Sequence, residues 1–110
     1  MPTEHPPVKE RPALVRFLTT EEGGRFTSPA SGVRSQLDLG EFQTTCTVES
    51  IAGPTILPLG EEVAVTIRPL FADRLGDAFA RLESVGLFEG NKHVASGRFI
   101  DVADTTRHDP

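Results

Sequence analysis

Three residues near the end of the chain, His93, Ser96 and Asp101, are of the types that supply a general base, a nucleophile and an orienting carboxylate. They belong to one stretch that reads as a β-strand, where successive side chains alternate between the two faces. Odd and even positions then point apart, so Ser96 is expected to face away from His93. We predict no catalytic triad and interpret His93 as a strand residue beside a turn.

Cys46 is the single cysteine of the chain, which excludes an internal disulfide and a cysteine-based zinc site. Residues 42–49 alternate with period two, and this alternation places Cys46 with the apolar side chains on the inward face. Burial raises the pKa of a thiol, so we expect a small core residue rather than a nucleophile. His5 and His108 lie near the two ends of the chain, where fixed ligand geometry is hard to build, and no metal site is predicted.

Paired carboxylates occur twice, at Glu21-Glu22 and at Glu61-Glu62. Adjacent strand residues point to opposite faces, so neither pair is expected to act as a general acid and base. The chain has no Gly-x-x-x-x-Gly-Lys-Ser/Thr loop to hold phosphates, which excludes the usual route to nucleotide hydrolysis. The sequence therefore predicts a protein that is not an enzyme, carries no cofactor and binds no nucleotide by itself.

The composition limits the chain to one small domain. It has 110 residues, 37% of them apolar and 25% charged, and its 11 Lys and Arg against 16 Asp and Glu give a net charge of -5. This acidity argues against a protein whose main task is to grip a phosphate backbone. No apolar run is long enough to span a bilayer and the Pro-rich start has no signal-peptide core, so we expect a soluble, cytoplasmic protein.

Alternating segments separated by Gly- and Pro-containing turns predict about six short strands, which is typical of an antiparallel barrel or sandwich. The predicted strands are residues 13–19, 33–39, 42–49, 63–68, 85–88 and 92–102. Residues 1–12 contain four prolines and residues 104–110 are polar, so both are expected to be disordered segments. The folded domain is thus predicted to cover residues 13–103.

One segment follows a helical rather than a strand period. Phe71, Leu75, Ala78, Phe79 and Leu82 recur at i, i+4, i+7, i+8 and i+11, which places them on one helical face. We predict a short helix over residues 72–83. The alternative is a long strand disturbed by a glycine at position 76.

Motifs in two regions stand in a recognisable order. Residues 21–25 read Glu-Glu-Gly-Gly-Arg, residues 32–37 read Gly-Val-Arg-Ser-Gln-Leu, and residues 88–97 read Phe-Glu-Gly-Asn-Lys-His-Val-Ala-Ser-Gly. They resemble the C-terminal β-barrel, or third domain, of elongation factor Tu, which carries Glu-Gly-Gly-Arg, then Gly-Tyr-Arg-Pro-Gln-Phe, then Arg-Glu-Gly-Gly-Arg-Thr-Val-Gly-Ala-Gly. The resemblance covers residues 13–102. It implies an all-β fold, a six-stranded antiparallel Greek-key barrel without the family's GTPase domain, in which the predicted helix is an insertion that covers an open end.

The resemblance also implies a binding surface. In the family, the Gln of the second motif and the Glu-Gly of the last one meet the T-stem of aminoacyl-tRNA, and they correspond here to Gln36, Glu89 and Gly90. Basic residues near them would contact phosphates. These residues are Arg25, Arg34 and Lys92.

Several family side chains are replaced in this chain. The motif Tyr is Val33, its Pro is Ser35, the leading Arg of the hairpin is Phe88 and the second Gly is Asn91. Phe88 adds apolar surface where the family is charged, which favours a protein contact over RNA.

We therefore expect a non-catalytic binding module with an unidentified protein partner, for which a translation component is one candidate, and with no membrane contact. The alternative is a tRNA- or RNA-binding accessory domain. A third interpretation is that the glycines and arginines only shape the corners of the barrel, with the arginines paired to nearby carboxylates.

Overall fold

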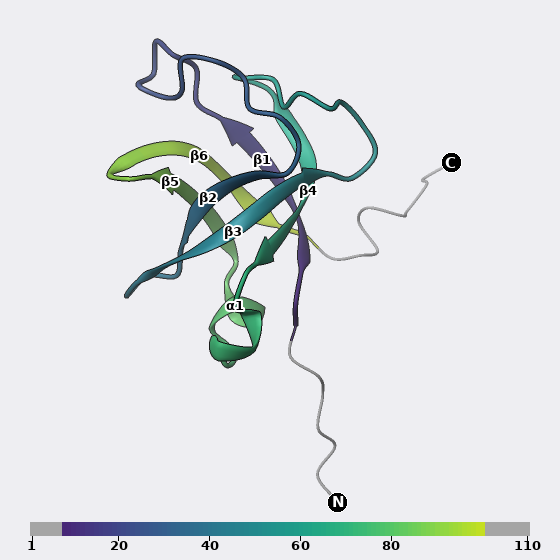
Figure 1. Ribbon diagram of the computed structural model, residues 1–110, viewed down its shortest axis with the longest axis vertical. Helices are drawn as coiled ribbons and strands as arrows, with labels where there is room; N and C mark the ends of the chain where they lie inside the picture. Colours follow the sequence, from purple (N-terminus) through teal and green to yellow (C-terminus); the bar gives the residue numbers. More distant parts are fainter. Residues whose placement is uncertain (1–7, 101–110) are drawn as a thin grey trace, which may run out of the picture.

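The computed structural model describes residues 8–100, and these form a closed antiparallel barrel (Figure 1). Its strands are β1 (Arg11–Phe17), β2 (Val33–Asp38), β3 (Gln43–Ser50), β4 (Glu62–Pro69), β5 (Ser84–Glu89) and β6 (Lys92–Phe99). The order around the barrel is β1-β4-β3-β2-β5-β6, in which the first four strands form a Greek key. The predicted all-β, six-stranded antiparallel barrel is confirmed.

The core of the barrel follows from period-two alternation. In β1, Ala13, Val15 and Phe17 are buried, and the residues between them face outward. Cys46 is fully buried, as predicted, whereas Phe42 precedes β3 and is half exposed. The most buried large side chains are Phe17, Leu37, Val48, Leu57, Val65, Ile67, Phe79, Leu87 and Val94.

Two predicted boundaries are wrong by a few residues. β1 begins at Arg11 and ends at Phe17, because Arg11 already pairs with Ile67 of β4. The Pro-rich arm therefore ends before Arg11 rather than at Pro12. Within the described residues β6 ends at Phe99 rather than continuing through residue 100. Residues 1–7 of the arm predicted over 1–12, residues 101–102 of the predicted last strand and the predicted tail at 104–110 lie outside the described residues.

The continuous helix predicted over residues 72–83 is wrong. A 3-10 turn, η1 (Ala72–Arg74), and a single helical turn, α1 (Ala78–Arg81), stand in its place. Gly76 between them has a φ of +58°, a left-handed conformation that ends a right-handed helix and that glycine adopts without strain. Of the predicted apolar face, Phe79 is buried against Phe99 but Phe71 is more than half exposed. The alternative of a long strand is also wrong.

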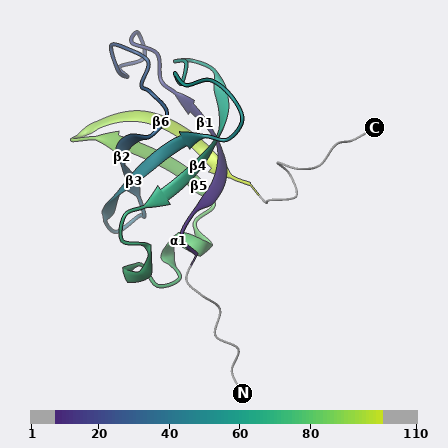
Figure 2. The same ribbon diagram turned by 45° about the vertical axis from the view of Figure 1, so that its right-hand side comes forward.

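The two ends of the barrel differ. α1 lies at one end, and the long connections 18–32 and 51–61 gather at the other, as the two views agree (Figures 1 and 2). These connections are joined by backbone hydrogen bonds from Leu57 to Pro29 and from Ser31 to Thr55, at 2.8 and 2.7 Å. In the described part of the chain no helix is long and apolar enough to cross a membrane.

The thiol of Cys46 is buried in the core and should be unreactive in the native protein. Burial raises its pKa from 9.0 to about 12. We expect no reaction with a disulfide reagent such as dithionitrobenzoate in the native protein at about pH 8, and rapid reaction once the chain is unfolded in guanidinium. Fast labelling of the native protein would contradict the buried position.

The raised pKa of Cys46 also makes the free energy of unfolding depend on pH. Below the unfolded-state pKa of 9.0 the thiol is protonated in both states, so it adds no pH dependence there. Above 9.0 the unfolded chain loses the proton and the folded chain keeps it. The free energy of unfolding should therefore fall as pH rises from 9.0 toward 12, and a Cys46→Ala chain should lack this component.

Candidate functional site

Most of the predicted binding residues meet where the β5–β6 hairpin touches the loop that follows β1. Arg25 forms an ion pair with Glu89, which joins two residues 64 positions apart in the sequence. Lys92 donates a hydrogen bond to the carbonyl oxygen of Gly24 at 3.4 Å, and its ammonium nitrogen lies 5.0 Å from the centre of the Phe26 ring. We call this region the hairpin surface, composed of Arg25, Phe26, Phe88, Glu89, Lys92 and His93.

The loop that carries Arg25 and Phe26 has its own internal bonds. The amide of Thr19 donates to Glu22 at 2.8 Å, and Arg16 forms an ion pair with the same carboxylate at 3.0 Å. Both interactions favour the charged carboxylate, so the pKa of Glu22 lies below its ordinary value. The hydroxyl of Thr20 donates to the carbonyl of Arg25 at 2.7 Å. These bonds hold the backbone that leads into Phe26.

Phe26 is the most exposed large apolar side chain of the described residues, with 82% of its surface accessible. The sequence pattern indicated Phe88 as the apolar contact, but Phe88 is half-buried and packs its ring against His93, with centroids 5.0 Å apart. Phe26 was missed because it belongs to no alternating segment. Its position immediately after the Glu-Gly-Gly-Arg turn, outside any predicted strand, was the signal that could have identified it.

Gln36 and Arg34 lie on β2, beside the hairpin rather than in it. Gln36 pairs with Phe88 across the β2–β5 ladder, and its side chain donates to the hydroxyl of Thr45 at 2.9 Å. Arg34 is exposed two residues earlier, beyond the part of β2 that pairs with β5. Gly90 occupies the turn between Glu89 and Lys92. The structure therefore brings Arg25, Phe88, Glu89, Gly90 and Lys92 together, places Gln36 beside them on β2, and leaves Arg34 apart.

A β-bulge in β6 changes one prediction about chemistry. Leu87 pairs with Ala95 while Phe88 pairs with His93, so Val94 is an extra residue and both it and Ala95 are buried. His93 and Ser96 consequently share the outer face, with the Ser96 hydroxyl oxygen 2.9 Å from Nε2 of His93. The predicted opposite orientation of these two side chains is wrong.

This contact does not make Ser96 a nucleophile. Nε2 of His93 also lies 2.9 Å from the carbonyl oxygen of Ala95, which only accepts hydrogen bonds. The tautomer that satisfies this carbonyl carries its proton on Nε2, and in that tautomer Nε2 has no lone pair with which to accept the proton of Ser96. Asp101, the third residue considered, lies outside the described residues.

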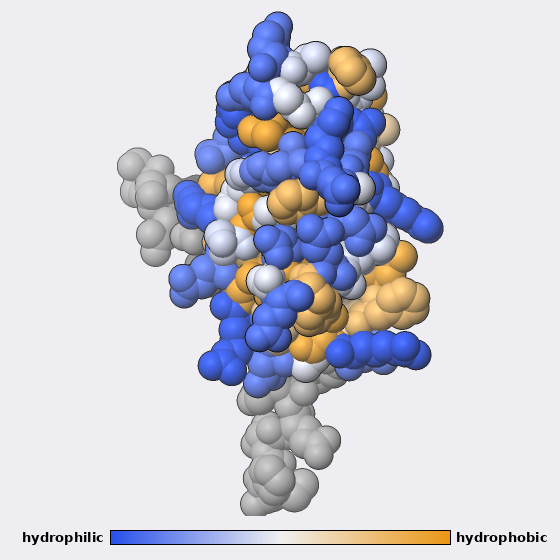
Figure 3. Space-filling view, turned by 90° about the vertical axis from the view of Figure 1, so that its left-hand side faces the viewer, coloured by the Kyte–Doolittle hydropathy of each residue, from blue (hydrophilic) through white to orange (hydrophobic). Residues whose placement is uncertain are grey.

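A second apolar patch lies away from the hairpin surface. Figure 3 shows hydrophobic side chains gathered toward the end of the barrel near α1, with hydrophilic ones around them. The exposed large apolar residues at the β2–β3 turn and after β4 are Phe42, Leu70 and Phe71. Phe42 is 50% accessible, which makes it a suitable control for Phe26.

Within residues 8–100 no three His, Cys, Asp or Glu side chains are grouped so that they could hold a metal ion. No protein-family model matches the chain, and no curated protein matches it. The function must therefore be argued from the surfaces of the barrel.

Proposed function

We propose that this barrel is a non-catalytic binding module whose hairpin surface contacts a protein partner. The observation that carries the proposal is the exposed ring of Phe26, held in place beside charged groups that already have partners. Aromatic side chains of this kind, surrounded by a polar rim, contribute most of the energy of many protein interfaces.

The charges of the same surface favour protein over RNA. The guanidinium of Arg25 is neutralised by Glu89, and Lys92 is engaged with a carbonyl and with the Phe26 ring. A phosphate would have to displace these contacts. Phosphate binding gains its strength from several free cations acting together, and the net charge of the chain is -5.

The class of partner comes from the resemblance of the motifs at residues 21–37 and 88–97 to the third domain of elongation factor Tu. In that family the barrel works by contact, with tRNA, the nucleotide exchange factor and the GTPase domain. We therefore propose a cytoplasmic translation component as the partner. The alternative role is a tRNA- or RNA-binding accessory domain in which Arg25, Arg34, Gln36 and Lys92 face the RNA.

Affinity capture with a Phe26→Asp chain tests the protein contact. We expect the wild-type chain and a Phe42→Asp control to enrich the same proteins from a ribosome-containing lysate, with recovery through the Phe26→Asp chain roughly 30-fold lower, as for a hot-spot residue. Because Phe26 packs against little but Lys92, the free energy of unfolding should change by less than about 0.5 kcal/mol. Equal recovery by all three chains, measured by quantitative mass spectrometry, would refute the proposed surface.

A salt titration with bulk tRNA tests the alternative role. Phosphate contacts are strongest at low ionic strength, so an RNA-binding surface should show an affinity that falls steeply as salt is added. On the protein-contact proposal, tRNA should not bind measurably even at the lowest salt. Salt-dependent binding that is lost in an Arg34→Gln chain would instead support the RNA-binding role.

A further inference from the structure

The sequence predicts a phosphate contact for Arg25, but its guanidinium makes two bonds inside the hairpin surface. Nη1 meets the carboxylate of Glu89 on β5, and Nε donates a hydrogen bond to the carbonyl oxygen of Thr27 at 3.1 Å. Thr27 follows Phe26 in the chain, and Arg25 precedes it. One side chain therefore joins the backbone after the exposed ring to the β5–β6 hairpin.

The backbone before Phe26 is held by separate contacts. The hydroxyl of Thr20 donates to the carbonyl oxygen of Arg25 at 2.7 Å. Gly24 is buried, and a Cβ added there would overlap the carbonyl oxygen of Leu18, so the loop lies against the end of β1 at this point. On this side the loop is anchored whether or not Arg25 keeps its own side-chain bonds.

The Arg25–Glu89 pair is less open to water than the other ion pairs within residues 8–100. Its side chains are 24% and 32% accessible, whereas those of the other pairs are 41–52% accessible. Water and salt screen an ion pair less where it is partly buried. The pair also joins residues 64 positions apart, so it constrains the loop rather than one strand.

We propose that Arg25 is a positioning residue, whose two bonds latch residues 25–27 to the β5–β6 hairpin and hold Phe26 in its exposed position. This inference rests on the proposed function, in which Phe26 meets the partner. A side chain that is already ordered loses less conformational entropy on binding. Because Glu89 neutralises the guanidinium, Arg25 acts on the partner through Phe26 and not through its own charge.

Backbone nitrogen-15 relaxation of the full isotope-labelled chain tests the latch. We expect order parameters of about 0.85 for residues 25–27 in the wild type, and values below about 0.6 in an Arg25→Gln chain. Glu89→Gln should also lower them, and the double variant should be no more mobile than Arg25→Gln alone, because both changes break one shared contact. The amide of Leu18, which donates to the carbonyl oxygen of Val94 at 2.9 Å, should keep its order in every variant.

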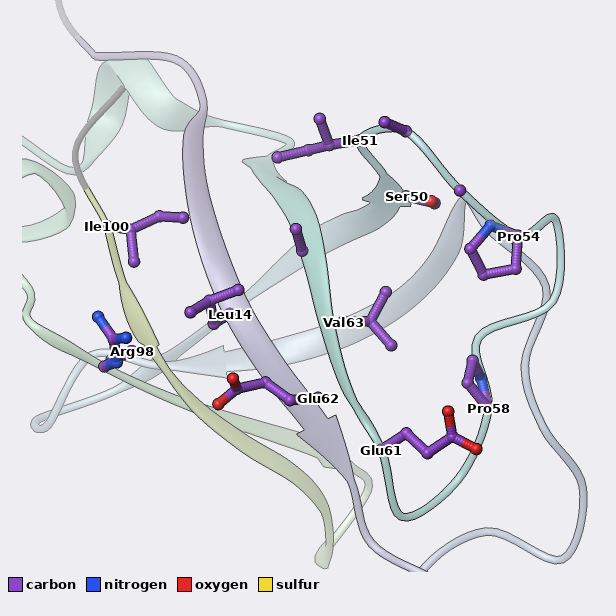
Figure 4. Close-up of a pocket in the computed structure, with 13 residues that line it drawn as sticks. Leu14, Ser50, Ile51, Pro54, Pro58, Glu61, Glu62, Val63, Arg98 and Ile100 are labelled. Carbon is purple, nitrogen blue, oxygen red and sulfur yellow. The ribbon is translucent and has the colours of Figure 1, made fainter. Parts of the chain in front are cut away.

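Arg98 supplies the matched control. It is exposed on β6, beside a groove of about 700 Å³ that lies over β1 and β4 (Figure 4). Within residues 8–100 it forms no ion pair, and the residues that line this groove do not belong to the hairpin surface. Arg98→Gln removes the same charge as Arg25→Gln, so residues 25–27 should stay as ordered as in the wild type.

Three results would overturn the latch. One is that residues 25–27 are already mobile in the wild-type chain, and another is that the Arg25→Gln chain keeps the order of the Arg98→Gln control. The third is a loss of order at Leu18 as well, because the ion pair would then stabilise the barrel as a whole. The proposed function fails separately, in the capture experiment with Phe26→Asp, since that change removes the ring and neither bond of the Arg25 side chain.

Discussion

A Gly97→Ala chain is expected to lose about 3 kcal/mol or more of folding free energy, through the addition of a single methyl group. Gly97 lies on β6 where this strand pairs with Val15 of β1. An added Cβ would lie 2.8 Å from the Cα of Val15 and 2.9 Å from the carbonyl carbon of Leu14, and closer still to the oxygen of Leu14. These are backbone atoms of a hydrogen-bonded ladder, so relief requires the β1–β6 pairing to open and the barrel to lose its closure.

Gly86 supplies the matched control for this prediction. It lies on β5 and pairs with Ser96, next to Gly97, but the nearest atom to an added Cβ is the Cβ of Asp38 at 3.6 Å, an ordinary contact. A Gly86→Ala chain should keep its free energy of unfolding within about 0.5 kcal/mol of the wild type. Urea denaturation followed by circular dichroism measures both chains. Equal urea midpoints for the two variants would show that the β1 and β6 backbones are far enough apart at Gly97 to accept a methyl group.

The strands were predictable because they obey a local rule. Alternation in β1, β3 and β4 is set by burial of every second side chain, and it correctly placed Cys46 and Val48 inside. Gly- and Pro-containing turns marked where each strand ends, so the number of strands followed. Closure into a barrel was expected only from the resemblance of the motifs.

The failures arose where a single residue changes the local rule. One extra residue, Val94, inverts the alternation in β6 and turns His93 and Ser96 to the same face. A left-handed Gly76 divides an apparently helical segment into two short turns, although its apolar spacing suits a helix. A bulge needs no special sequence, and the φ of a glycine is set by its surroundings, so periodicity alone reveals neither.

The candidate site was predicted as a set of residues but not as an arrangement. Motif order indicated that Arg25 and Glu89 lie near each other, yet their pairing depends on a contact between segments 64 residues apart. That pairing removes a free cation from the surface. Phe26 becomes conspicuous only once the burial of the other phenylalanines is known, because exposure depends on the whole fold rather than on its neighbours in the sequence.

Replacement of Arg11 by methionine is expected to cost about 2–4 kcal/mol of stability, the second largest effect that we predict. The guanidinium carbon of Arg11 lies 4.1 Å from the centre of the Phe99 ring, a cation–π contact. One of its nitrogens donates to the carbonyl oxygens of Phe79 and Leu82, each at 2.6 Å. These carbonyls belong to the last turn and the C-cap of α1. At four residues α1 is too short to be stable alone. Arg11 therefore fixes α1 to the start of β1.

Two further variants separate the anchoring of α1 by Arg11 from a general effect of losing a positive charge. Lysine keeps the charge but lacks the planar fork, so Arg11→Lys should recover less than half of the lost stability. Arg74 lies 5.6 Å from the ring centre of Phe71, but both side chains are exposed, and Arg74→Met should change stability by less than about 0.5 kcal/mol. Urea denaturation gives the free energies, and hydrogen exchange at residues 78–82 should quicken only in the Arg11 variants. If the Arg11→Met chain were as stable as the Arg74→Met chain, α1 would be held by Phe79 packing alone.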